Sequence, residues 1–300
     1  MKSPEFFRLK ELVDQHILDY LPEIDPKSNT LKESMSYSLT AGGKRIRPIL
    51  FLYTLEFCGH ENIKFGLPYA CAIEYIQTYS LIHDDLPAMD NDDYRRGMLT
   101  NHKVFGEAQA ILAGDGLLSA AYEVMSKDML LYLDDPEKLK RIVRCVYTIS
   151  KGTGCRGMVA GQVADVENEH KKCSAEMLDY IHDNKTAAFL RSSILAGGYL
   201  GGASPERMEA LRTYGDCLGL AFQIMDDIRD VIGDSKEMGK TLGKDLRDEK
   251  NTYTSVHGLE KAQERAQELI DKAREAMEPF YDEAEVFNDI IDYIEAKIHE

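Results

Sequence analysis

The chain has 300 residues, of which 44% are hydrophobic and 29% charged, and its formal net charge is −16. This composition is typical of a globular protein with an ample core, and an acidic chain disfavours nucleic acid or an anionic membrane as a general partner. The six cysteines include no C-x-x-C pair, which argues against a zinc site or a disulfide framework. Because we find no leader-like start and no apolar run long enough to span a membrane, we expect a cytoplasmic protein without a membrane span.

Helical periodicity dominates the chain. Apolar residues three and four apart predict a helix over 7–21, and long apolar segments at 69–82, 108–125 and 211–224 predict buried helices. The tail, 259–298, is rich in Ala, Glu, Lys and Ile and also predicts helix. Most prolines fall between these segments, and no alternating series of strands is present. We therefore predict an all-α fold in which residues 1–300 form a single domain.

One segment allows another interpretation. Residues 142–150 are rich in β-branched and aromatic side chains, and residues 152–157 follow with the pattern G-x-G-x-x-G. This pattern indicates a dinucleotide site only within a β-α-β series. Since no such series is present, a break between two helices is the better interpretation.

A cluster of acidic residues closes the apolar run 218–225. Asp226, Asp227 and Asp230 stand at i, i+1 and i+4, which places Asp226 and Asp230 on one face of a helix. Like charges at this spacing repel, and acids near a helix C-terminus oppose its dipole, so a bound cation is expected to compensate them. Oxygen ligands without cysteine or histidine favour magnesium.

Another such cluster, which is the first along the chain, ends the apolar segment 69–82. Asp84, Asp85 and Asp90 belong to it, and Asp84 and Asp90 are about 240° apart on an ideal helix. They can bind one metal only if the helix ends between them, and Pro87 is placed to end it. One acidic cluster alone would most simply be a solvated helix end. Two that each close an apolar helix favour a pair of facing metal sites.

Basic residues gather beside these acids, although the chain is acidic. Each group alone resembles a surface loop, but together they favour a diphosphate held between magnesium and cations, because arginine binds phosphate oxygens bidentately and glycine admits an anion close to the backbone. We find neither a Walker loop nor a nucleophile motif. The groups are Gly42-Gly43-Lys44-Arg45-Ile46-Arg47, Arg95-Arg96, Lys185-Thr186, and Lys240, Lys244 and Lys250.

These residues resemble the trans-isoprenyl diphosphate synthases, in particular the bacterial farnesyl diphosphate synthase type, over nearly the whole chain. The matching motifs are GGKRIRP (42–48), YSLIHDDLPAMDNDDYRRG (79–97), AILAGDGLL (110–118), GMVAGQVAD (157–165), HDNKT (182–186), FQIMDDIRDVIGD (222–234) and GKTLGKDLRDEKNTY (239–253). The resemblance implies a helical bundle of the isoprenoid synthase type around a deep central cavity, in a protein that is usually a homodimer. It also implies head-to-tail condensation of isopentenyl diphosphate with an allylic diphosphate, dimethylallyl or geranyl.

The resemblance assigns roles to the acidic residues. Asp84, Asp90 and Asp226 would bind three magnesium ions, and Asp230 would be a further ligand. Asp85 and Asp227 would support the ions directly or through water, as Asp230 could also do. The aspartates would then be an electrostatic scaffold rather than nucleophiles.

It assigns the other polar residues to the substrates. The allylic diphosphate would lie on Arg95, Lys185 and Lys240, with Lys244 and Lys250 nearby. Isopentenyl diphosphate would lie on the loop at Gly43, and there on Lys44, Arg47, Arg96 and Gln77. The oxygens of Thr186 and Gln223 would face the developing cation.

Three positions depart from the family pattern. Gln77 replaces a usual histidine, so its amide can donate to phosphate but cannot carry charge. Arg229 replaces an apolar residue within the second cluster, where it could pair with an aspartate or point to solvent, and we favour solvent. Lys297 replaces a common arginine, which leaves open whether the tail contacts a diphosphate.

Product length should depend on the residue below Asp84. Tyr79 lies five residues earlier, about 7.5 Å along a helix, and Ser80 is small, so Tyr79 would form the floor. With two extra residues in the first cluster, this resembles producers of fifteen-carbon farnesyl diphosphate. A geranylgeranyl diphosphate synthase is the first alternative. A non-catalytic partner subunit is disfavoured because the aspartates and the GGKR cations are kept, and a terpene cyclase would not need Lys44 and Arg47.

Overall fold

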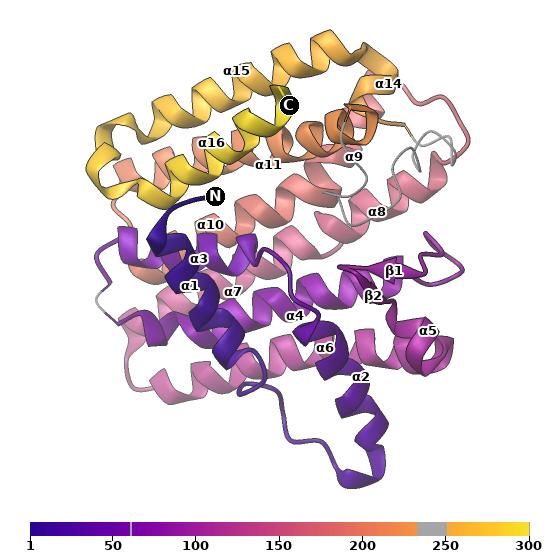
Figure 1. Ribbon diagram of the computed structural model, residues 1–300. Helices are drawn as coiled ribbons and strands as arrows, with labels where there is room; N and C mark the ends of the chain where they lie inside the picture. The colour runs from indigo at the N-terminus through magenta and orange to yellow at the C-terminus, as the bar shows by residue number, and fades with distance from the viewer. Residues whose placement is uncertain (61, 233–250, 300) are drawn as a thin grey trace.

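The structure, a computed structural model, describes residues 1–60, 62–232 and 251–299, and they form an all-α fold, as predicted (Figure 1). The α-helices are α1 Pro4–His16, α2 Asn29–Thr40, α3 Ile46–Phe57, α4 Leu67–Asp84, α5 Asn101–Phe105, α6 Glu107–Met129, α7 Pro136–Thr153, α8 Met158–Glu167, α9 Ala175–His182, α10 Ala188–Gly201, α11 Pro205–Ile232, α14 Tyr253–His257, α15 Leu259–Met277 and α16 Glu285–His299. Short 3-10 turns are η1 Pro26–Ser28, η2 Ile63–Gly66, η3 Leu130–Tyr132 and η5 Glu278–Glu283; η4 Asp183–Ala187 is a π-helical turn. None of these helices is long and apolar enough to cross a membrane.

Helix α3 lies at the centre of the fold. Its residues are apolar nearly all round and almost all are buried, which is the pattern of a helix with neighbours on every side. It packs against α4 and α10. Gly197 of α10 allows the closest approach, because a Cβ atom there would lie 2.5 Å from the carbonyl oxygen of Phe51. The helices that carry the first and second acidic clusters, α4 and α11, therefore pack around a common core.

The outer helices form layers on this centre. Helix α4 packs against α6, α7 packs against α10, and α15 packs against α11 and α16 (Figure 1). Helix α7 contains the whole of residues 142–150, ends at Gly154 and is followed by α8 from Met158. The interpretation of the glycine pattern as a helix break is thus confirmed.

Two boundaries differ from the sequence-based expectation. Helix α1 ends at His16, and residues 17–20 form turns ahead of Pro22 rather than a continued helix. The tail forms two helices, because η5 interrupts it at Pro279.

A short hairpin was not foreseen. Strands β1 Tyr94–Arg95 and β2 Met98–Leu99 pair antiparallel, and Arg96 and Gly97 form the turn with φ of 54° and 78°. Two positive φ values suit the two-residue turns of right-twisted hairpins. The hairpin directly follows the first acidic cluster.

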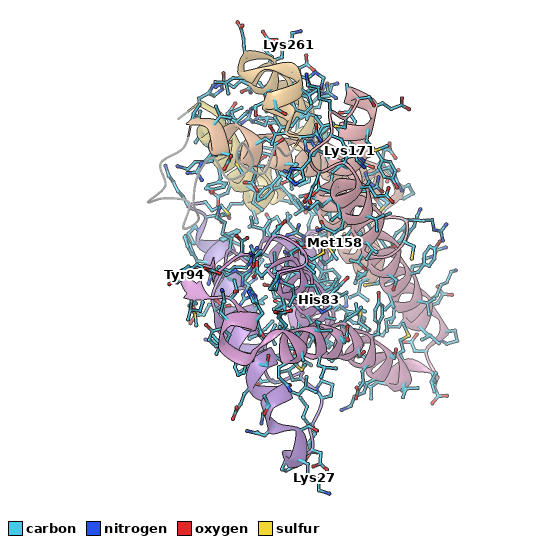
Figure 2. All side chains as sticks on the ribbon, turned by 90° about the vertical axis from the view of Figure 1, so that its right-hand side faces the viewer. Lys27, His83, Tyr94, Met158, Lys171 and Lys261 are labelled. Atoms are coloured by element: carbon cyan, nitrogen blue, oxygen red, sulfur yellow. The ribbon has the colours of Figure 1, made fainter. Side chains whose placement is uncertain are left out.

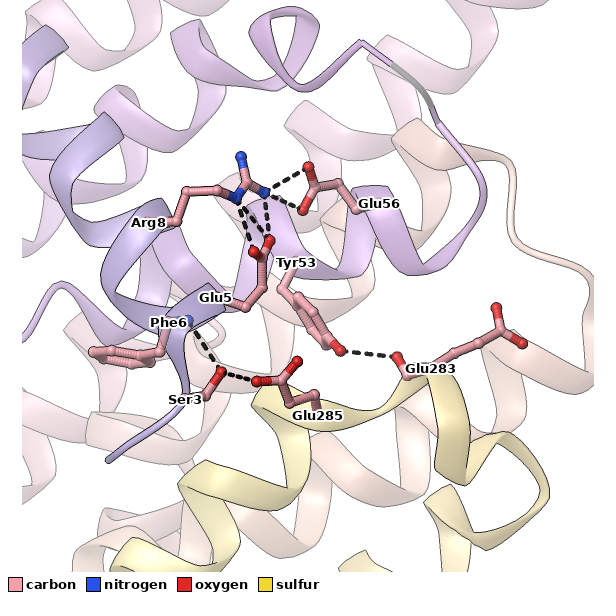
Figure 3. Close-up of polar contacts among 8 residues, drawn as sticks. All are labelled: Ser3, Glu5, Phe6, Arg8, Tyr53, Glu56, Glu283 and Glu285. Carbon is pink, nitrogen blue, oxygen red and sulfur yellow. Dashed lines mark hydrogen bonds and ion pairs between the residues drawn. The ribbon is translucent and has the colours of Figure 1, made fainter.

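The N-terminal segment is tied to the C-terminal helices (Figure 3). The Ser3 hydroxyl donates to Glu285 at 2.6 Å, and the Tyr53 hydroxyl donates to the Glu283 carbonyl at 2.8 Å. Arg8 binds both Glu5 and, at 2.7 Å, Glu56 of α3. These contacts hold α1, α3 and α16 together at one edge of the bundle.

A buried ion pair holds the loop between α2 and α3. Arg45 has a positive φ of 53° and is 3% exposed. Its guanidinium contacts Glu74 of α4 at 2.5 Å, Asp14 of α1 at 2.8 Å and the Leu39 carbonyl at 2.5 Å. Arg45 is therefore a structural residue that joins three helices.

Replacing Arg45 by methionine should lower the free energy of unfolding by about 3–5 kcal/mol, because it leaves the buried Glu74 carboxylate without its main partner. Urea unfolding followed by circular dichroism measures this. Arg8→Ala, which removes a largely exposed pair, is the matched control and should cost less than about 1 kcal/mol. Equal losses in the two variants would contradict a structural role for Arg45.

Candidate active site

A cavity of about 500 Å³ lies between α3, α4, α8, η4 and α11. Figure 2 shows two of its lining residues, His83 of α4 and Met158 of α8, in the middle of the molecule. It brings together many residues that the sequence singled out. They are Arg47, Gln77, Tyr79, Ser80, Asp84, Lys185, Thr186, Gln223 and Asp226.

The first acidic cluster lies in a loop that turns back at the C-terminal end of α4. The helix ends at Asp84, before Pro87, as predicted. The Asp90 backbone N–H donates to the Asp84 carbonyl at 2.8 Å, and the Asp92 N–H donates to the Asp85 carbonyl at 3.2 Å. The chain therefore folds back and places Asp90 beside Asp84, which a straight helix could not do.

Asp84 faces the cavity in an unfavourable electrostatic setting. Burial raises the pKa of its carboxyl to about 6, and Asp90 adds to the rise, while Lys185 and Arg95 oppose it. The Gln162 side-chain amide donates to Asp84 at 2.9 Å. A carboxylate in this setting is suited to binding a cation.

Asp85 has a different environment, although it is the next residue. It is 3% exposed, and Arg95 binds it with two contacts of 2.8 Å from Nε and one of 2.5 Å from Nη2. Neither residue lines the cavity. The hydrogen bonds between Asp85 and Arg95 fix the hairpin to α4.

In the second cluster, too, one aspartate lines the cavity and the others are buried outside it. Asp226 lines the cavity, opposite Asp84, whereas Asp227 and Asp230 are 4% and 7% exposed and do not line it. Asp227 accepts hydrogen bonds from the Gln223 amide at 3.0 Å and from the Tyr253 backbone N–H at 2.6 Å. The predicted facing of the two clusters thus involves Asp84 and Asp226.

A chain of hydrogen bonds fixes two polar groups at the cavity wall. The Thr186 hydroxyl donates to the Gln223 carbonyl oxygen at 2.7 Å, and the Gln223 amide donates to Asp227. His182 Nε2 lies 3.4 Å from Asp227, and burial lowers the pKa of His182 to about 4. Because the Thr186 hydroxyl uses its hydrogen in the bond to Gln223, the lone pairs of its oxygen remain available toward the cavity.

Lys185 is held by residues to which the sequence assigned no role. Its ammonium contacts Asp165 of α8 at 2.6 Å. Gly161 packs against the Lys185 backbone, since a Cβ atom there would lie 2.1 Å from the Lys185 nitrogen. Gln162 and Asp165 both stand in the GMVAGQVAD motif, three residues apart on one helix, and that spacing was the available signal for a shared site.

The glycine-rich cationic loop contributes mainly Arg47 to the cavity. Arg47 lies over the Phe189 ring at 5.1 Å, and burial lowers its pKa to about 10. Its Nε and the Gln77 side-chain oxygen are buried and have no hydrogen-bond partner among the described residues. Buried polar groups of this kind favour a polar ligand in the cavity.

The neighbouring cations make other contacts. The Lys44 ammonium contacts the Tyr293 hydroxyl of α16 at 2.5 Å, and Arg96 donates to the Gly42 carbonyl. Gly43 makes room for Arg96, because a Cβ atom there would lie 2.6 Å from the guanidinium carbon. Lys44 and Arg96 thus flank the cavity without lining it.

One expectation is wrong. Arg229 is 8% exposed rather than turned to solvent, and it belongs to the buried residues of α11. Lys297 lies in α16 and does not line the cavity. Lys240, Lys244 and Lys250 lie outside the described residues.

Comparison with known proteins identifies the family of the chain. The polyprenyl synthetase family profile matches residues 28–293. The chain is 41% identical over 290 residues to a farnesyl diphosphate synthase of Bacillus subtilis, covering 97% of this chain and 96% of that protein. It is 47% identical over 270 residues to the chloroplastic heterodimeric geranylgeranyl pyrophosphate synthase large subunit 1 of Arabidopsis thaliana, covering 89% and 71%.

A solved structure has the same architecture. The geranyltransferase of Helicobacter pylori, complexed with magnesium and isoprenyl diphosphate, superposes with a TM-score of 0.81 at 29% identity, covering 98% of this chain and 97% of that one. The resemblance drawn from the motifs is confirmed. The chain belongs to the polyprenyl synthetase family and is a short-chain trans-prenyl diphosphate synthase.

Proposed function

We propose that the protein condenses isopentenyl diphosphate head-to-tail with dimethylallyl and geranyl diphosphates, in a magnesium-dependent reaction that yields farnesyl diphosphate. The observation that supports this most is the position of Asp84 and Asp226, from two separate helices, on one cavity with Arg47 and Lys185. Carboxylates and cations on one cavity suit a diphosphate that is held both through metal and directly.

The residues present fit magnesium. The candidate ligands Asp84, Asp90, Asp226 and Asp230 offer only hard oxygen donors, and burial together with Asp90 raises the pKa of Asp84. Among the described residues no group of three or more histidine, cysteine or acidic side chains converges on one point. That is consistent with magnesium, which often takes one or two carboxylates and completes its shell with water and substrate phosphates. We propose three ions, as the family resemblance implies.

The chain's own residues supply positioning and charge. Bound magnesium would neutralise the departing diphosphate. Lys185, positioned by Asp165, and Arg47 would bind diphosphate oxygens directly. The Thr186 and Gln223 oxygens, oriented through Asp227, would stabilise positive charge on the allylic carbon. The isopentenyl double bond would then attack that carbon, and the proton lost from the adduct would pass to the diphosphate.

Further assignments stay predictions. Gly43, Lys44, Gln77 and Arg96 would complete the isopentenyl diphosphate site, and Lys240, Lys244 and Lys250 the allylic site, with Arg95. We propose one domain over residues 1–300, a cytoplasmic location and a homodimer. Exposed apolar side chains on α6, Ile111 and Leu112, 44% and 53% exposed, support a dimer contact there, which the mass from light scattering tests.

The product is proposed from the position of Tyr79. It is 8% exposed and lines the cavity below Asp84, together with the smaller Ser80. Its ring packs edge-on against His83 at 5.8 Å, and burial raises its pKa to about 12. A fixed aromatic side chain at this depth would stop a growing chain. Geranylgeranyl diphosphate is the alternative, supported by the names of several relatives.

The direct test combines purified protein, magnesium, isopentenyl diphosphate and, separately, dimethylallyl, geranyl and farnesyl diphosphates, with products separated by chromatography. We expect farnesyl diphosphate, and no product with EDTA. Asp226→Asn should lower kcat about 100- to 1000-fold, because charge stabilisation is lost. Asp179→Asn, an exposed carboxylate on α9, is the control and should leave kcat unchanged. Absence of condensation by the unaltered protein would overturn the proposal.

Magnesium binding should weaken as the pH falls through about 6, because the pKa of Asp84 is raised to that value and only the ionised carboxylate binds the cation. Between pH 7.5 and 5.5 the ionised fraction, and hence the affinity, should fall about fourfold. Calorimetric titration with magnesium at the two pH values measures this. Asp84→Asn should bind more weakly at both and lose the dependence; an unchanged dependence in that variant would assign it to another group.

Replacing Tyr79 by alanine should shift the main product from fifteen to twenty or more carbons, because the floor of the cavity is removed. Chromatography of the dephosphorylated products measures the shift. Ser80→Ala removes almost no volume from the same wall and should leave the product length unchanged. If both variants make only the unaltered protein's product, Tyr79 is not the floor.

A further inference from the structure

A second, smaller pocket lies between α7, α10 and α11 and has a volume of about 240 Å³. Five of its lining residues are cationic and none is acidic, although the chain as a whole carries a net charge of −16. We call it the basic pocket. Its cations are Arg144, Lys151, Arg156, Arg191 and Arg212.

The charge of the basic pocket is only partly compensated. Arg191 contacts Asp183 at 3.0 Å and Asp216 at 2.8 Å, and these contacts hold its guanidinium in place. Arg212 has a weaker contact, 3.9 Å from Glu209. The pocket therefore combines one cation that ion pairs hold in place with others whose charge is not neutralised by a close acidic partner.

Three cations have no acidic partner. Arg144, Lys151 and Arg156 are exposed and form no ion pair within the part of the chain that the structure describes. Arg144 and Lys151 are seven residues apart, so they share one face of α7. Like charges held together raise the free energy of the folded protein, and a bound anion would lower it.

Hydroxyl groups complete the lining. Tyr147 and Tyr199 line the basic pocket, and their hydroxyls make no hydrogen bond to the described residues. The wall beneath is tightly packed, since a Cβ atom at Gly152 would lie 2.3 Å from the Ser192 hydroxyl oxygen. The pocket thus presents charged and neutral donors on a rigid wall, and the carboxylates next to it, Asp183 and Asp216, are paired with Arg191 and do not line it.

These features identify the class of ligand. Guanidinium, ammonium and hydroxyl groups donate to phosphate oxygens, and several cations together suit a group with more than one negative charge. A pocket of about 240 Å³ admits a small anion rather than a polymer. We propose that the basic pocket is a second binding site for a diphosphate group, separate from the catalytic cavity. The choice of diphosphate rests on the proposed function, in which it is both a substrate group and the released product.

The two sites can be tested independently because they share no lining residue. In EDTA the catalytic cavity presents Asp84 and Asp226 without metal, and these repel diphosphate. The basic pocket needs no metal. Because Arg47 and Lys185 of the catalytic cavity could still bind diphosphate directly, only the binding in EDTA that is lost on substitution of Lys151 and Arg156 reports on the basic pocket.

Calorimetric titration of the full chain in EDTA should detect binding of inorganic diphosphate or of geranyl diphosphate, and the two arms distinguish the free anion from a prenyl headgroup. The variant Lys151→Gln/Arg156→Gln should bind about 10- to 100-fold more weakly, because two charge-assisted contacts are lost. Lys27→Gln/Lys261→Gln removes the same charge from two exposed residues at the bottom and the top of the molecule in Figure 2, neither of which lines the basic pocket, and should bind like the unaltered protein.

Equal affinity in the unaltered protein and both double variants, or no binding of either compound in EDTA, would overturn the proposal. Condensation activity with magnesium is measured alongside, and both double variants should retain it because their residues lie outside the catalytic cavity. Loss of binding with retained activity supports the second site. If the unaltered protein binds in EDTA, the Lys151→Gln/Arg156→Gln variant loses this binding and the unaltered protein never condenses its substrates, the proposed function fails and the basic pocket stands.

Discussion

Repulsion between carboxylates at one cavity is the constraint on which this site depends. Asp84 and Asp226 come from the ends of different helices, and Asp90 is folded back beside Asp84. Burial raises the pKa of Asp84 to about 6, so its charge is costly near neutral pH. Lys185 and Gln162 offset part of this cost. The remaining charge is what a divalent cation can neutralise.

In each pair of adjacent aspartates, one residue lines the cavity and the other holds the surrounding structure in place. The first residue, Asp84 or Asp226, faces the cavity, while the second, Asp85 or Asp227, is buried and hydrogen-bonded. Asp85 fixes the hairpin through Arg95, and Asp227 orients Gln223. The second aspartate therefore holds the scaffold that keeps the first in position. Substitution of the second aspartate would therefore act mainly by displacing the first aspartate from its position at the cavity.

The cations divide in a similar way. Arg45 joins three helices and does not line the cavity. Arg47, two residues later, lies over the Phe189 ring, and its buried Nε has no hydrogen-bond partner among the described residues. Lys185 reaches the cavity from a π-helical turn whose backbone packs on Gly161. The basic pocket gathers a separate set of cations on α7, α10 and α11. The catalytic cavity and the basic pocket thus hold separate groups of cations.

The sequence by itself determined the helical fold, the break after residue 153, the end of α4 before Pro87 and the two acidic clusters. These follow from local periodicity and from the geometry of proline and glycine, which act within a few residues. Only the tertiary structure decided that Arg47 rather than Lys44 lines the cavity, that Arg229 is buried, and that Gln162 contacts Asp84. The direction of a long polar side chain depends on partners far away in sequence, as the contact between Gln162 and Asp84, 78 residues apart, shows.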